Sequence, residues 1–212
     1  MRDADMRLGP KRQKTRETIL ACAEEAFIKN GFVGTDISEI AEKAGVDKRT
    51  IYRYFSGKEA LAFIIWCNVL EMVLKKGMAA SGANGFKKLA NSLNLYIENA
   101  LAHREIIRFL GEFDHTFSGE YPNVAEAKMF VEYVKTHENA FSIYLKEGVK
   151  DGSIQSDLDV PLTASTLSNI MLALCQRVVI RDKHLSEEQG YSNEVLPQAV
   201  KIILEGIKGS RV

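Results

Sequence analysis

Hydrogen-bond donors and phenol rings are concentrated between residues 48 and 54, where the sequence reads KRTIYRY. On a helix, Ile51 and Phe55 would share an inward face because they are four residues apart. The side chains left to point outward or along the flanks are Lys48, Arg49, Thr50, Tyr52, Arg53 and Tyr54. Lys, Arg and Thr can donate to base edges in a major groove, and Tyr and Lys can contact phosphates. This segment has the chemistry needed to read duplex DNA.

Two short helices and a tight turn would position these donors. Apolar residues at helical spacing give the first helix one buried face, and they are Ile37, Ile40, Ala41 and Ala44. Gly45 follows at the point where a helix can end in a left-handed residue. Asp47 has the acceptor side chain of an N-cap for the second helix, 48–55. Asp36, three residues before Glu39, has capping-box spacing for the first helix, and Thr35 is an alternative cap.

The pattern resembles the DNA-binding segment of the tetracycline-repressor (TetR-type) family of bacterial one-component regulators. It consists here of Gly31-Phe32, Thr35, Ile40-Ala41, Ala44-Gly45-Val46, Thr50, Tyr52-Arg53-Tyr54-Phe55 and Lys58-Glu59-Ala60-Leu61, without gaps. Helix-turn-helix docking places Lys48 and Arg49 at base edges. The resemblance implies that Thr50, Tyr52, Tyr54 and Lys58 contact phosphate or a thymine methyl, with Thr35 and Ser38 flanking the same backbone. Alternatively, Tyr52 packs against the first helix, Arg53 faces solvent, or the whole segment is a core hairpin with a solvated basic face.

Helical periodicity continues through the rest of the chain, and no strand alternation interrupts it. The predicted helices cover roughly 11–30, 58–80, 86–102, 104–117, 122–150, 160–183 and 193–208. We therefore predict an all-α fold with an N-terminal three-helix DNA-binding domain at 1–57, whose residues 1–10 form a disordered arm. A C-terminal helical bundle at 58–212 would bind a ligand and dimerise. Gly152 should end one helix in a left-handed residue, and Asp157 or Asp159 should cap the next.

The resemblance also implies an apolar effector cavity between the fourth and eighth helices. Candidate lining residues are Trp66, Phe109, Phe113, Phe130, His137 and Met171, although a helical aromatic stripe is more often core packing than a pocket. The last two helices carry wide apolar stripes, and in the family such helices pair across a two-fold axis. We place the seam of a homodimer at Leu174, Val178, Val200 and Ile203.

Composition is that of a soluble globular protein. The 212 residues carry no net charge, but residues 1–58 hold 12 basic and 9 acidic side chains against 16 and 19 in residues 59–212. The apolar runs are too short to span a bilayer and no signal peptide is evident, so we expect a cytoplasmic protein. The three cysteines are widely spaced and most resemble buried hydrophobic residues; a thiol sensor is the alternative. Glu112 and His115 have a spacing that can hold a metal, or form an ordinary polar patch.

The function these features indicate is a ligand-responsive transcriptional regulator, most simply a repressor. It would bind a pseudo-palindromic DNA operator as a homodimer and be released by a small apolar or amphipathic effector. The alternative is a DNA-binding protein of the same fold whose bundle recruits a protein partner. An enzyme is disfavoured because the sequence has no Gly-rich phosphate cradle, no nucleophile elbow and no His-Glu-x-x-His pair, and no cofactor is expected.

Overall fold

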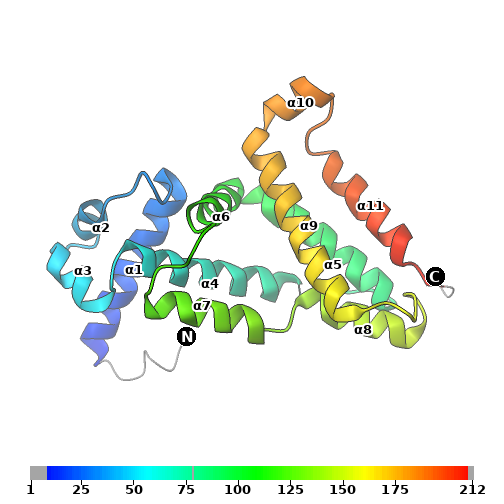
Figure 1. Ribbon diagram of the computed structural model, residues 1–212, viewed down its shortest axis with the longest axis horizontal. Coiled ribbons are helices and arrows are strands. Elements are labelled where there is room, and N and C mark those ends of the chain that lie inside the picture. Colours follow the sequence, from blue (N-terminus) through cyan, green and yellow to red (C-terminus); the bar gives the residue numbers. More distant parts are fainter. Residues whose placement is uncertain (1–8, 78, 210–212) are drawn as a thin grey trace. The chain divides into compact units, whose positions relative to one another are not determined.

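The computed structural model describes residues 9–77 and 79–209, and in those residues the chain forms eleven α-helices and no strand (Figure 1). The helices are α1 Pro10–Asn30, α2 Ile37–Lys43, α3 Lys48–Tyr54, α4 Lys58–Gly77, α5 Gly85–Ala102, α6 Arg104–Thr116, α7 Ala125–Thr136, α8 Ala140–Asp151, α9 Val160–Arg181, α10 Lys183–Gln189 and α11 Val195–Ile207. The predicted all-α class is confirmed. Most of the predicted arm, residues 1–8, lies outside the described residues.

The chain folds into two compact units. The first comprises the chain up to Val69 together with Arg108–His137, and the second comprises Leu70–Ile107 together with the chain from Glu138 onward. The helices α4 and α6 therefore each contribute to both units. The domain boundary predicted after residue 57 stays a prediction.

Aromatic side chains form the core of the first unit. Phe27 of α1 stacks on Phe109 of α6 with ring centroids 6.2 Å apart. The ring centroid of Phe63 on α4 lies 5.0 Å from that of Phe113 on α6 and 5.3 Å from that of Phe130 on α7. All five rings are buried. These contacts hold α1, α4, α6 and α7 together.

In the second unit, α5 packs against α8, α9 and α11. The approach of α5 to α8 is close, since a Cβ on Gly85 would lie 2.1 Å from the backbone nitrogen of Gly148. The same corner is tied by Asp151 Oδ2, which accepts from the Gly85 amide at 2.8 Å. Gly152 adopts the predicted left-handed conformation with φ 78°, and Asp159 caps α9 by accepting from the Leu162 amide at 3.0 Å.

Two predicted features differ from the structure. The single helix expected over 122–150 is instead α7 and α8, broken between His137 and Asn139. Asn139 causes a new start, because its side chain accepts from the Phe141 amide at 2.9 Å and donates to Ser168 Oγ at 2.5 Å. The short helix α10 falls where a break was expected around Ser186, and it ends at Gly190 with φ 77°.

Candidate nucleic-acid interface

The predicted turn between two short helices is present. Asp36 caps α2 by accepting from the Ser38 amide at 2.6 Å, and Asp47 caps α3 by accepting from the Thr50 amide at 2.6 Å. Between the helices Gly45 has φ 66°, in the left-handed region where glycine carries no Cβ penalty. Asp36 and not Thr35 is therefore the cap of α2.

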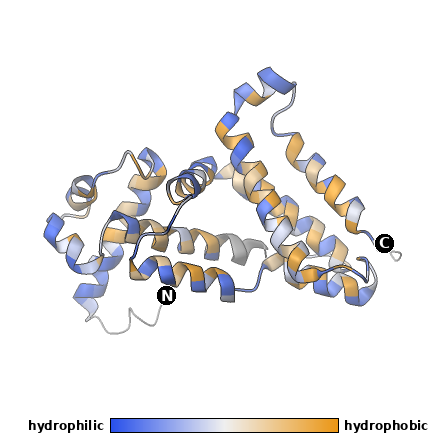
Figure 2. Ribbon diagram, viewed as in Figure 1, coloured by the Kyte–Doolittle hydropathy of each residue, from blue (hydrophilic) through white to orange (hydrophobic). Residues whose placement is uncertain are grey.

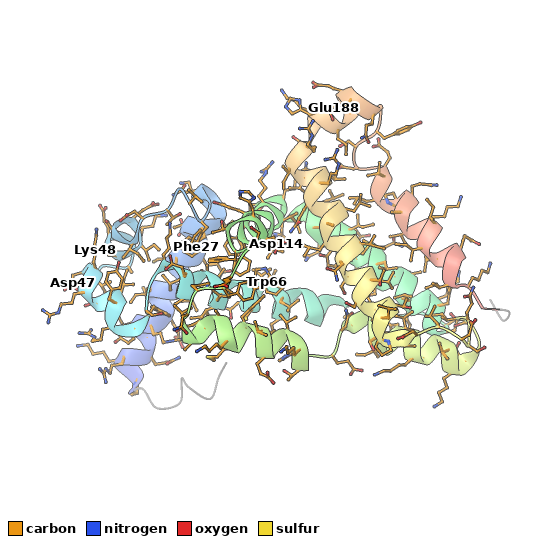
Figure 3. The ribbon with its side chains drawn as sticks, in the orientation of Figure 1. Phe27, Asp47, Lys48, Trp66, Asp114 and Glu188 are labelled. Atoms are coloured by element: carbon orange, nitrogen blue, oxygen red, sulfur yellow. The ribbon has the colours of Figure 1, made fainter. Side chains whose placement is uncertain are left out.

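The helix α3 separates its apolar and polar side chains as predicted. Ile51 is fully buried and Phe55, the residue that ends the helix, is 2% exposed. The side chains of Lys48, Arg49, Tyr52 and Arg53 are exposed, whereas Thr50 and Tyr54 are half-buried. Lys48 and its neighbour Asp47 lie at the outer edge of the first unit, away from its aromatic core (Figure 3). The side chain of Tyr52 is 56% exposed, so it is not packed against α2, the first helix of the helix-turn-helix.

Carboxylates share this surface with the basic groups. Hydrogen bonds from Ser38 hold the pKa of Asp36 below its ordinary value, and hydrogen bonds from Thr50 do the same for Asp47. Asp36 Oδ1 also lies 3.7 Å from Lys48 Nζ. The two carboxylates are charged at neutral pH and offset part of the basic charge of α3.

The two predicted contacts from the preceding helix differ from each other. The Thr35 side chain is buried, and its hydroxyl donates to the Gly31 carbonyl at 2.7 Å, so it cannot reach DNA in this conformation. Its role here is to tie the end of α1 to the start of α2. Ser38 is half-buried and its hydroxyl is bonded to the carboxylate of Asp36.

Lys58, the first residue of α4, lies against the loop that joins α1 to α2. Its Nζ donates to the carbonyls of Phe32 at 2.8 Å and Thr35 at 3.0 Å, and it lies 4.4 Å from the centroid of the Phe32 ring. An ammonium group has three donors, so one N–H remains for a phosphate.

The geometry agrees with a family-level sequence match. Residues 19–63, which run from α1 into α4, match the model of the bacterial regulatory proteins of the tetR family. Residues 19–63 therefore form a tetR-family domain. Similar curated proteins include the fatty acid metabolism regulator protein of Bacillus subtilis, 27% identical over 157 residues that cover 68% of this chain and 73% of that protein. The Escherichia coli K12 regulator RutR is 39% identical over 59 residues, 28% of each chain.

Solved structures of regulators share the fold along almost the whole length. FadR of Bacillus subtilis, solved in complex with stearoyl-CoA, superposes with a TM-score of 0.66 at 22% identity over 90% of this chain and 98% of that one. KstR2 of Mycobacterium tuberculosis superposes with a TM-score of 0.59 at 18% identity over 92% and 95%. At these identities the likeness concerns the fold. The role of a DNA-binding transcription regulator rests instead on the tetR-family match of residues 19–63 and on the curated relatives.

The six candidate ligand-binding residues do not form one group. Trp66, Phe109, Phe113 and Phe130 belong to the aromatic core of the first unit, where Trp66 lies 4.9 Å from Phe130 between ring centroids. The buried Nε1 of Trp66 has no hydrogen-bond partner among the described residues. Met171 is fully buried in the second unit on α9.

His137 is exposed at the end of α7. Its ring lies against Tyr133 with centroids 3.6 Å apart, and its Nδ1 is 2.9 Å from the Tyr133 carbonyl oxygen. The structure therefore brings together four of the six candidates in one unit, and places His137 at the surface of that unit.

Neither sensing alternative from the sequence gains support. Burial raises the pKa of Cys67 to about 11 and that of Cys175 to about 12, so both stay as unreactive thiols at neutral pH. Within the described part of the chain no group of three or more His, Cys, Asp or Glu side chains could hold a metal ion. Glu112 instead accepts hydrogen bonds from backbone amides of the α1–α2 loop.

Proposed function

We propose that this regulator binds a pseudo-palindromic operator as a homodimer, represses transcription there, and is released by a small apolar or amphipathic effector in the cytoplasm. The observation that carries the DNA-binding part is α3. It buries Ile51 against the unit and exposes Lys48, Arg49, Tyr52 and Arg53 on one short helix. A recognition helix that enters a major groove needs this division of apolar and donor side chains.

An exposed apolar strip on α9 supports the homodimer. Seven of the exposed residues of α9 lie on one face of the helix, four of them apolar, and they are Leu162, Thr166, Asn169, Ile170, Ala173, Arg177 and Ile180. Leu162 is 64% exposed and Ile180 57% exposed, so large aliphatic groups face solvent at both ends of the strip. Hydrophobic residues recur along α9 and α11 (Figure 2). A second copy of α9 would cover such a strip in a helix-pair interface.

The strip replaces part of the seam predicted from the sequence. Val178 is fully buried and Val200 is 3% exposed, so both belong to the core of their own chain and cannot face a partner. Leu174 and Ile203 are half-buried. By length and composition α9 could also cross a membrane, the single such case among the described helices, but core helices of soluble proteins pass the same test.

For the effector we propose an amphipathic molecule with a long apolar chain, and stearoyl-CoA is the first compound to test. Support comes from FadR of Bacillus subtilis, a protein with this fold whose crystal structure is a complex with stearoyl-CoA. The chain has one tryptophan, Trp66, and its position beside Phe113 and Phe130 makes it a fluorescence reporter of binding in the first unit. Its unpartnered Nε1 could donate to a polar atom of the effector.

The DNA-binding proposal is tested by selection from a pool of random duplexes. The wild-type protein should enrich one inverted repeat, with half-sites about one or two helical turns apart, because a two-fold dimer presents two recognition helices. Enrichment of no sequence would contradict the proposal. Enrichment of a single, unrepeated half-site would contradict the homodimer alone.

The sensor proposal is tested on the selected duplex with and without stearoyl-CoA. Release should appear as an operator affinity about 5–150-fold lower when the ligand is saturating, together with a change in Trp66 emission. An unchanged affinity after a clear Trp66 response would favour the alternative, in which the bundle recruits a protein partner. No response in either measurement would exclude this acyl thioester and leave the DNA-binding proposal standing.

A further inference from the structure

A carboxylate from α6 is bound by the backbone of the loop that joins α1 to α2. Glu112 Oε2 accepts from the Phe32 amide at 3.0 Å, and Oε1 accepts from the Val33 amide at 2.8 Å. Hydrogen bonds to an ionised acceptor are about twice as strong as neutral ones. One side chain therefore engages two consecutive amides with both of its oxygens, about eighty residues away along the chain.

Gly31 is required for this contact on two separate grounds. It has φ 78°, where a residue with a Cβ is disfavoured. In addition, a Cβ at this position would lie 2.5 Å from Glu112 Oε2. The loop conformation and the approach of the carboxylate thus depend on the same glycine, so the contact is built into the loop.

The loop is held on its carbonyls as well as on its amides. Lys58 Nζ donates to the Phe32 and Thr35 carbonyls, while Glu112 accepts from the amides of Phe32 and Val33. The next residue, Asp36, is the cap that starts α2. Because α2 leads directly into the turn and α3, whatever fixes this loop also fixes the direction in which α3 presents its donors.

We propose that Glu112 is a positioning residue for operator recognition: it contacts no DNA, and it sets α2 and α3 by holding the 31–35 loop to α6. The inference rests on the proposed DNA-binding function.

For the Glu112→Gln variant, the proposal and simple electrostatics predict opposite changes in affinity for the selected duplex. Removing a negative charge from a DNA-binding unit should by itself tighten binding to any duplex. The proposal predicts the opposite for the duplex selected by the wild-type protein, an affinity about tenfold lower. Affinity for a scrambled duplex of equal length should stay the same or rise, so the ratio of specific to non-specific affinity falls. A variant that is merely part-unfolded would lose both affinities alike.

Glu120→Gln is the matched control, because it makes the same charge change at an exposed position after α6. It should leave the ratio unchanged. Amide hydrogen exchange provides a second measurement that needs no DNA: exchange at Phe32 and Val33 should accelerate in Glu112→Ala and not in Glu120→Ala.

The outcomes separate this proposal from the proposed function. If Glu112→Gln keeps the wild-type specificity ratio while the wild type reads a defined operator, Glu112 does not position the reading helices. If the wild type enriches no duplex, DNA recognition itself is wrong. In that case equal exchange rates at Phe32 and Val33 in Glu112→Ala and wild type would also refute the hold on the loop.

Discussion

The helices α3 and α9 present opposite kinds of surface. The seven residues of α3 expose cationic and phenolic side chains and bury Ile51, so the outward face differs in type from the inward face. The helix α9 exposes Leu162 and Ile180 while it also buries Met171 and Val178, so large apolar side chains stand on both of its faces. A surface for a polyanion is recognisable from residue types, whereas a surface for a second copy of the chain resembles the core.

This difference explains why the two sites were predicted with unequal success. For α3 the prediction of inward Ile51 and outward Lys48 and Arg49 holds in the structure. For α9 and α11, apolar residues stand on more than one face, and periodicity alone could not decide which face meets the chain's own α5 and α8 and which meets a partner. Val178 and Val200 were assigned to the wrong face for this reason.

The largest expected effect comes from a charge on the exposed strip of α9. Ile170→Glu should produce monomers at micromolar concentration, because it places a carboxylate at the middle of the proposed interface. Operator affinity should fall by about a hundredfold or more, since the two half-sites are no longer bound jointly. Sedimentation and fluorescence anisotropy on the selected duplex measure the two effects.

Tyr191→Glu serves as the control for this change. Tyr191 is 63% exposed and lies outside α9, in the loop between α10 and α11. It should leave the dimer and the operator affinity unchanged. A wild-type protein that sediments as a monomer would show that the exposed face of α9 is not a dimer interface.

On α3 the expected effect is smaller and specific to sequence. Arg49→Ala should weaken operator binding by about 1–3 kcal/mol and relax the preference at one base pair, because Arg at the start of a recognition helix can pair bidentately with guanine. Binding to a scrambled duplex should change far less. An equal loss of affinity for all duplexes would instead mean that Arg49 contacts phosphate. The helix α3 would then differ from α9 by its positive charge and not by base recognition at Arg49.

Lys58 and Glu112 hold the same loop, yet they should affect DNA binding differently. In Lys58→Met the slope of log affinity against log salt should flatten by about one unit, because the third N–H of Lys58 is available to a phosphate. In Glu112→Gln the slope should stay as in the wild type. An unchanged slope in Lys58→Met would make both side chains positioning residues and remove Lys58 from the DNA contact set.

The sequence predicted the helical class, the helix-turn-helix and its caps because each depends on residues within a few positions of one another. Gly45, Asp47 and Gly152 all act as expected. The hold of Glu112 on the loop could not be predicted, since it joins residues about eighty positions apart through backbone amides that every residue has. The break at Asn139 was missed although an Asn before an apolar run is a recognisable N-cap signal.

The smallest expected effect concerns the way each region caps its helices. Asp47 caps α3 locally, whereas Asp151 joins two helices of the second unit by accepting from the Ser153 and Gly85 amides at 2.9 and 2.8 Å. Hydrogen bonds from Ser153 and Gly85 lower the pKa of Asp151 from its ordinary value of 3.8. A carboxyl group with a lowered folded pKa stabilises the protein fully above its ordinary pKa, and this stabilisation is lost as the pH falls through the folded pKa.

Asp151→Asn should therefore lower the melting temperature by a few degrees at pH 7, and the gap to the wild type should close in acid, below about pH 4. Asp157→Asn, at an exposed position in the loop before α9, is the matched control and should melt as the wild type does at both pH values. Thermal melts followed by circular dichroism measure the gap. A gap of the same size at pH 7 and pH 3 would mean that Asp151 acts by shape and not by charge, and the second unit would then be held by packing at Gly85 and Gly148 rather than by its carboxylate.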